Sequence, residues 1–188
     1  PGSTLPWITE AKLLGYQGKE KDALLVMRKA VQKFDEDADL RAQLAQMNAE
    51  SGRHGDAEQL YWQLYEETDD LSGKLRWAQE LAKLAETQGK VEQLVAAFDE
   101  RRRNNRRSIV PLLALSEIHR VTDHYEERRQ ALAMATKIKP DDLQLLLQVA
   151  RIEETEGKWQ QALATLERAA ELDKTDRTRR KIAQLPLT

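Results

Sequence analysis

The chain of 188 residues contains no cysteine, which excludes disulfide bonds, thiol nucleophiles and cysteine-ligated metal centres. Aromatic residues make up only 5% of the sequence, and its 8 glycines are isolated, so no glycine-rich phosphate loop exists. No apolar run approaches the roughly 20 residues that a membrane-spanning helix needs. The sequence therefore favours neither thiol nor nucleotide chemistry, and it contains no membrane segment.

Charged residues are abundant, at 33%, but the two signs nearly cancel to a net charge of −2. Such a chain has no overall attraction to nucleic acid or to an anionic membrane. The lack of cysteine fits a reducing compartment and favours the cytoplasm. Residues 1–4 are interpreted as the remnant of a tag or the cut edge of a longer protein, so a targeting signal could lie outside this sequence.

Apolar residues recur every three or four positions along the chain, as in Leu81, Leu84 and Ala85, which is typical of amphipathic helices. Short breaks separate these helical patterns, and each is marked by one turn residue: Gly18, Gly52, Gly89, Asp123 and Gly157. The separations are 34, 37, 34 and 34 residues. A period near 34 predicts stacked helical hairpins, each covered by its neighbours.

The positions around these turns resemble the tetratricopeptide repeat (TPR) family. Five residues after the turn the family has a small residue, and here stand Ala23, Ala57, Leu94, Arg128 and Ala162. Nine after, it has a large apolar residue, and here stand Met27, Tyr61, Phe98, Leu132 and Leu166. Before the turn its small residue is matched by Ala11, Ala45, Ala82, Ser116 and Ala150. The resemblance covers residues 5–174.

This resemblance implies an all-α fold, a right-handed superhelical α–α solenoid of five TPR-like hairpins with a C-terminal helix. The expected hairpins are residues 5–36, 38–70, 71–107, 108–140 and 142–174. Residues 175–188 are expected to form a capping helix, begun by Thr175 or Asp176, or the start of a truncated sixth repeat. Its arginines and Lys181 are expected on an exposed outer face.

Three irregularities are expected in the middle of the array. The three extra residues near Asp69–Gly73 predict a longer connection or an extra turn on the next helix. Arg128 at a small-residue position is expected to splay its hairpin or to direct its head to solvent. Arg101 predicts that the second helix of the third hairpin ends early or packs loosely.

In the TPR family the first helices of the hairpins line a concave groove that holds peptides. The resemblance implies that this face consists of Lys12, Gln43, Gln46, Glu50, Gln79, Lys83, Glu86, Leu113, Glu117, Arg120, Leu147, Arg151 and Glu154. Leu113 and Leu147 are the expected exposed apolar anchors. Ile8 and Lys12 stand where chaperone-binding members have Lys and Asn, which disfavours that role. The expected function is a scaffold that binds a protein or peptide, without catalysis or cofactor.

An arginine run is the second candidate surface, and it comprises Arg101, Arg102, Arg103, Arg106 and Arg107. Guanidinium groups can bind phosphates or an acidic protein segment. Positive charge at a helix end also offsets the helix dipole, which needs no ligand. No aromatic residue is interleaved for base stacking, so an acidic protein is favoured over nucleic acid.

Other reactive residue types lack the spacing that chemistry requires. His119 and His124, even with Asp123, do not share one helical face and so do not predict a metal site. Ser116 and His119 lack a third group to orient them, and the paired carboxylates fit a solvated surface. Trp62 and Tyr65 are expected to fill the interface to the third hairpin or, alternatively, to anchor a partner. Self-association through residues 172–185 is a further alternative.

Overall fold

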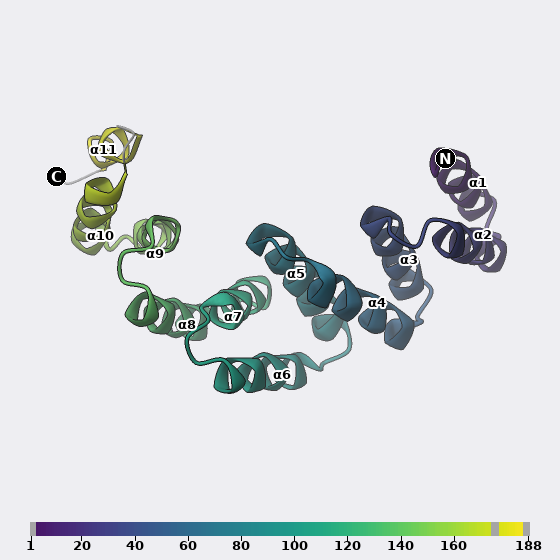
Figure 1. Ribbon diagram of the computed structural model, residues 1–188, viewed down its shortest axis with the longest axis horizontal. Helices are drawn as coiled ribbons and strands as arrows, with labels where there is room; N and C mark the ends of the chain where they lie inside the picture. The colour runs from purple at the N-terminus through teal and green to yellow at the C-terminus, as the bar shows by residue number, and fades with distance from the viewer. Residues whose placement is uncertain (1–2, 174–176, 186–188) are drawn as a thin grey trace. The chain divides into compact units, whose positions relative to one another are not determined.

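The computed structural model describes residues 3–173 and 177–185. Within these ranges the regular secondary structure is entirely α-helical, which confirms the predicted fold class. The helices are α1 (Leu5–Tyr16), α2 (Glu20–Lys33), α3 (Ala38–Glu50), α4 (His54–Glu67), α5 (Leu71–Thr87), α6 (Val91–Asn104), α7 (Val110–Val121), α8 (Tyr125–Ile138), α9 (Leu143–Thr155), α10 (Trp159–Leu172) and α11 (Arg177–Ile182) (Figure 1). None of the described helices is both long and apolar enough to cross a membrane.

The chain divides into two compact units, Pro1–Lys90 and Val91–Thr188. Unit 1 contains α1 to α5, and unit 2 contains α6 to α11. The boundary follows the turn at Gly89 and so falls inside the range expected for the third hairpin. Within unit 1, α1 packs on α2 and α3 packs on α4; within unit 2, α7 packs on α8 and α9 on α10.

Each predicted turn residue adopts the left-handed backbone conformation. The φ angles are 73° at Gly18, 75° at Gly52, 63° at Gly89, 56° at Asp123 and 71° at Gly157. One residue further on, the backbone N–H donates to a carbonyl five residues back, as from Lys19 to Leu14 at 2.9 Å. The same bond follows the other four turns at 2.8 Å. This pairing satisfies carbonyls at the helix end that would otherwise lack a donor.

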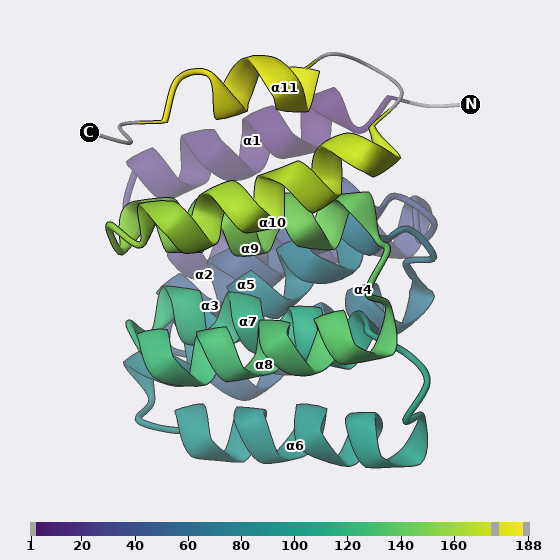
Figure 2. The same cartoon turned by 90° about the vertical axis from the view of Figure 1, so that its left-hand side faces the viewer.

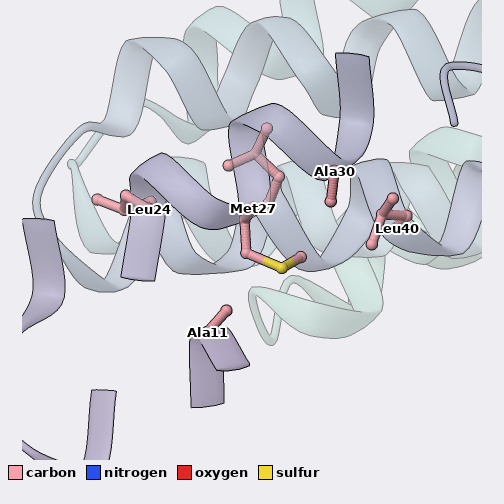
Figure 3. Close-up of a cluster of buried hydrophobic side chains, with 6 residues drawn as sticks. Ala11, Leu24, Met27, Ala30 and Leu40 are labelled. Carbon is pink, nitrogen blue, oxygen red and sulfur yellow. The ribbon is translucent and has the colours of Figure 1, made fainter. Parts of the chain in front are cut away.

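The core is built from small and large residues in alternation along neighbouring helices. In the first hairpin Ala11 of α1 lies beside Met27 of α2, and Leu40 of α3 joins the same cluster. Figure 3 shows the Met27 side chain between Ala11 and Leu40 in that view. Alanine allows the helix axes to approach closely, and the larger side chain fills the space beside it.

The insertion before α5 adds a helical turn, which confirms one of the two expectations for this segment. Helix α5 has 17 residues, against 13 in α3. The Asp70 carboxylate caps its start by accepting from the Gly73 N–H at 2.8 Å. A Cβ at Gly73 would lie 2.5 Å from a Thr68 methyl group. Thr68 is itself fixed, because its hydroxyl oxygen accepts from Trp77 Nε1 at 2.9 Å.

For each of the other two expected irregularities, one of the two alternatives is wrong. Helix α6 does not end early: it has 14 residues, the length of α4 and α8, and its Phe98 is fully buried. The hairpin that contains Arg128 is not splayed, since α7 and α8 pack on each other. The Arg128 side chain is instead accommodated half-buried, and its Nε has no hydrogen-bond partner.

Helix α11 lies against α10 (Figures 1 and 2). Its start is tied to the end of α10 by Asp173, whose Oδ2 accepts from the Thr178 N–H at 3.0 Å and from the Thr178 hydroxyl at 2.6 Å. The expected caps Thr175 and Asp176 lie outside the described residues. The last helical hairpin is therefore partly covered by α11.

We expect Gly73→Ala to lower the free energy of unfolding by about 1 kcal/mol, because the clash with the fixed Thr68 exceeds the gain in helix propensity. Gly55→Ala is the matched control. A Cβ at Gly55 meets no atom within 4 Å, so alanine should raise stability there. Urea titrations of the two variants check the opposite signs, and a stabilising Gly73→Ala would contradict the tight contact.

At the fourth turn we expect the protein to be most stable with Gly at position 123, less stable with Asp and least stable with Ala. The φ of 56° strains a residue with a Cβ, and Asp tolerates this conformation better than Ala does. The steps should each be about 0.5–1 kcal/mol, since glycine also increases unfolded-chain entropy. Thermal unfolding of Asp123→Gly and Asp123→Ala tests the order. An Ala variant as stable as the parent would exclude strain at this turn.

Candidate functional site

A hollow of about 450 Å³ lies in unit 1 among α1, α2 and α3. Four of the predicted groove residues line it: Lys12, Gln43, Gln46 and Glu50. Its floor is apolar and consists of buried residues, among them Leu24 and Met27. The hollow therefore combines an apolar base with a rim of amides and opposite charges, which is the usual composition of a ligand-binding pocket.

Ile8, Gly15, Tyr16 and Met47 also line this hollow, and the sequence analysis did not select them for the groove. Gly15 lies three residues after Lys12, so helical spacing alone would have placed it on the same face. It has no side chain, and a Cβ built there meets no atom within 4 Å. The bare backbone at Gly15 therefore leaves one side of the hollow open.

A second, smaller hollow of about 280 Å³ lies among α3, α4 and α5. Gln46 and Glu50 line it as well as the first hollow, and the predicted residue Lys83 completes its rim. Gln46 Nε2 donates to Glu50 Oε1 at 2.9 Å, and Lys83 pairs with Glu80 at 2.7 Å. Two adjacent hollows thus share the side chains of α3.

Tyr61 also lines the smaller hollow. Burial raises the pKa of Tyr61 to about 12, and the carboxylates of Glu80 and Glu50 contribute in the same direction. Its hydroxyl is therefore protonated at neutral pH. The predicted residues Gln79 and Glu86 lie on the same helix as Lys83, half-buried and exposed respectively.

Of the aromatic pair after Tyr61, Tyr65 belongs to the unit 1 core and Trp62 is half-buried beside it. Tyr65 is buried and meets the Trp62 ring edge-on at a centroid distance of 5.8 Å. Lys74 of α5 lies over the Tyr65 ring at 4.7 Å, and Trp77 stacks on Tyr61 at 6.4 Å. The contacts with α5 support the packing interpretation of this segment.

In unit 2 some of the predicted groove residues line an open groove, and others form ion pairs within the protein. Leu147 and Arg151 line a groove of about 740 Å³ whose other side is formed by α11. Glu154 pairs with Lys181 of α11 at 2.9 Å. Glu117 pairs with Arg120 at 2.7 Å within α7.

The prediction for Leu113 is wrong. Its side chain is only 3% exposed, so it belongs to the core and offers no anchor to a partner. The distance of Leu113 from the turn residue gives its place on α7, but it does not show whether a neighbouring helix buries the side chain. The expected outer face of α11 is also wrong in part, because Arg177, Arg180 and Lys181 line the groove with α9.

The arginine run does not present five equivalent side chains. Arg101 donates to the Ala97 carbonyl at 3.2 Å, and Arg102 pairs with Asp99 at 2.8 Å, both within α6. Arg103, Arg106 and Arg107 are exposed. Helix α6 ends at Asn104, so the last two arginines lie in the connection to α7. An anion-binding role for this run stays a prediction.

The two histidines of the fourth turn lie close together, with ring centroids 6.0 Å apart. No group of three or more His, Asp or Glu side chains that could hold a metal ion occurs in the described part of the chain. Asp123 accepts a hydrogen bond from the Tyr125 hydroxyl at 2.9 Å, and Ser116 is buried. These contacts all lie around the fourth turn and fit a role in holding that turn together.

No family model matches the sequence, and no similar curated protein was found. Among solved structures, the thermophilic TPR protein TTC0263 of Thermus thermophilus is 19% identical, with a TM-score of 0.51 over 96% of this chain and 97% of that one. A tetratricopeptide repeat protein from Parabacteroides merdae is 18% identical, with a TM-score of 0.48 and coverages of 95% and 70%. YrrB, a TPR protein with an unusual peptide-binding site, is 12% identical, with a TM-score of 0.46 and coverages of 97% and 93%.

These helical hairpins define an α–α repeat protein. The likeness to TTC0263 shows that the repeat is of the tetratricopeptide type, so the chain has the TPR fold. The resemblance drawn from the turn residues is thereby confirmed at the level of the fold. The left-handed turns and the small residues around them are its structural basis in this chain.

His119 predicts a pH dependence of stability. Burial lowers its pKa, His124 acts in the same direction, and Glu127 and Asp99 oppose them. The unfolded chain, with a histidine pKa of about 6.5, therefore takes up the proton more readily than the folded protein. The contribution is complete above about pH 6.5 and is lost as the pH falls through the folded pKa.

The temperature of half-unfolding should accordingly decrease as the pH is lowered from about 7.5 to about 5.5. The variant His119→Gln should show a smaller decrease over the same pH range. Circular dichroism melting curves across this range provide the measurement. A slope that is unchanged in the variant would show that the pH dependence arises from other groups.

Proposed function

We propose that the chain is a non-catalytic protein-interaction scaffold that binds a peptide segment along the first helices of unit 1. The observation that carries the proposal is the hollow of about 450 Å³ on α1, α2 and α3. Four residues selected for the groove from the repeat pattern line this hollow around an apolar floor. The TPR fold supports the same interpretation, since it supplies rigid helices on which such a surface can be held.

The chemistry of the hollow indicates the kind of segment that it would take. A large apolar side chain would enter above Leu24 and Met27, where it would leave water. Burying a side chain of this size contributes about 2 kcal/mol, or about thirtyfold in affinity. The amides of Gln43 and Gln46 can each donate to and accept from a peptide backbone.

The rim carries charges of both signs, which would set the orientation of the segment. Lys12 of α1 and Glu50 of α3 both line the hollow, and both are exposed. Glu50 accepts a hydrogen bond from the Gln46 amide, which is neutral and so leaves the negative charge in place. A segment with a basic residue on one side of its apolar anchor and an acidic residue on the other would complement this rim.

The experiment uses Gly15→Leu, which should close the hollow without disturbing the fold. The new side chain meets no atom near its Cβ, and leucine has the higher helix propensity, so stability should not fall. Peptides selected from a random display library on the parent chain should bind the variant at least about tenfold more weakly. Fluorescence polarisation measures the dissociation constants.

Gly55→Leu is the matched control, because it makes the same change at an exposed position of α4 with equal space around it. The control should leave the affinities unchanged. Equal binding by the Gly15→Leu variant and the parent would reject the hollow as the peptide site. Equal losses in both variants would reject it too, because they would show a general effect of the added leucine.

A further inference from the structure

The groove between α9 and α11 in unit 2 is lined mainly by cationic and amide side chains. Its cations are Arg151 on α9 and Arg177, Arg180 and Lys181 on α11, and its amides are Gln144, Gln148 and Gln184. Among the described residues that line it, the one carboxylate is Asp173, whose Oδ2 already accepts two hydrogen bonds from Thr178. The groove has a volume of about 740 Å³.

Arg151 extends this positive charge toward α7 and α8. Burial lowers the pKa of Arg128, and the positive charges of Arg120 and Arg151 lower it further against the opposing effect of Glu117. Arginines of three helices therefore lie close enough to repel one another. The Arg128 Nε is buried without a hydrogen-bond partner.

The carboxylates near these cations are already engaged. Glu117 pairs with Arg120 at 2.7 Å, and Glu154 pairs with Lys181 at 2.9 Å. Arg151 has no ion pair or side-chain hydrogen bond among the described residues. Among the residues that the structure describes, the groove thus carries more positive than negative charge, although the whole chain has a net charge of −2.

The composition of the groove selects among anionic occupants. No aromatic ring occurs among the described residues of its lining, so bases would have nothing to stack on there. The three glutamine amides can pair with a peptide backbone, and Leu143 and Leu147 offer apolar contacts between the charges. Guanidinium groups match carboxylates with two parallel hydrogen bonds.

We propose that the α9–α11 groove binds an acidic peptide segment whose carboxylates pair with Arg151, Arg177 and Arg180. This inference rests on the proposed function in that the chain binds peptides and that Leu147 and Arg151 belong to the groove predicted from the repeat pattern. It assigns a separate site in unit 2, and it names the chemistry of the peptide. An anion in the groove would relieve the repulsion among the arginines, so binding should also stabilise the fold.

The test measures fluorescence polarisation of a short labelled peptide in which Glu alternates with Ser and Leu. A copy with Gln in place of every Glu serves as the uncharged probe. The acidic probe should bind more tightly than the copy, and its affinity should fall as salt rises. Arg151→Glu and Arg180→Gln should each weaken it, the first by at least about tenfold.

Arg151→Lys keeps the charge but loses the paired geometry, so an intermediate loss is expected. Lys29→Glu is the matched control, because it reverses one exposed charge on α2 of unit 1, outside the groove and outside the arginine run. It should leave binding unchanged. Circular dichroism melting checks that each variant is folded, and Arg180→Gln retains the test if Arg151→Glu does not fold.

Equal weakening by Lys29→Glu and Arg151→Glu would overturn the proposal, since only general charge attraction would remain. Equal affinity for the acidic probe and its Gln copy would overturn it too. Tighter binding of a single-stranded oligonucleotide than of the acidic probe would also overturn the proposal, because it would indicate nucleic acid as the ligand of the groove. Gly15→Leu should bind the acidic probe as the parent does, which separates this result from that of the unit 1 hollow.

Discussion

The left-handed residue at each turn is the constraint on which the repeat depends. At all five turns a positive φ brings the next backbone N–H to a carbonyl five residues back, at 2.8 or 2.9 Å. That bond ends one helix and fixes where the next begins. Four turns use glycine, which adopts this conformation without a clash, and Asp123 adopts it with some strain. Once the turn is fixed, the register of the two helices follows.

The register of the two helices then determines at which positions a small residue is needed. Ala23, Ala57 and Ala162 follow their turns by the same number of residues, and all are buried. Each allows two helix axes to approach, while the large residue four positions later fills the adjacent space. These alanines lie on second helices, and Ala23 also belongs to the lining of the unit 1 hollow. The packing residues therefore form the base of that hollow, while the first helices α1 and α3 supply its polar rim. The α9–α11 groove likewise takes side chains from a first helix, α9.

The turns, the helices and much of the unit 1 rim were predictable because they follow from a local rule repeated along the chain. Lys12, Gln43, Gln46 and Glu50 were found by counting from the turns, and the structure brings them around one hollow. Counting failed for Leu113, whose burial depends on what packs over it. It also failed for α11, because a helix after the last repeat has no repeat position, so its cationic side could be located only in three dimensions.

Arg128 links the irregularity of the repeat to its chemistry. Arg128 places a guanidinium where the repeat has a small residue. The group is half-buried and its Nε has no hydrogen-bond partner, so it disturbs the packing and loses part of its hydration. The hairpin nevertheless remains packed, so the rest of the repeat outweighs this unfavourable contribution. Residues that break a local rule without a packing gain are expected where a protein binds something. Arg128 does not line the α9–α11 groove, but it lies close enough to Arg151 for the charge of Arg151 to lower the Arg128 pKa, so it would add to the positive potential that the proposed acidic peptide meets.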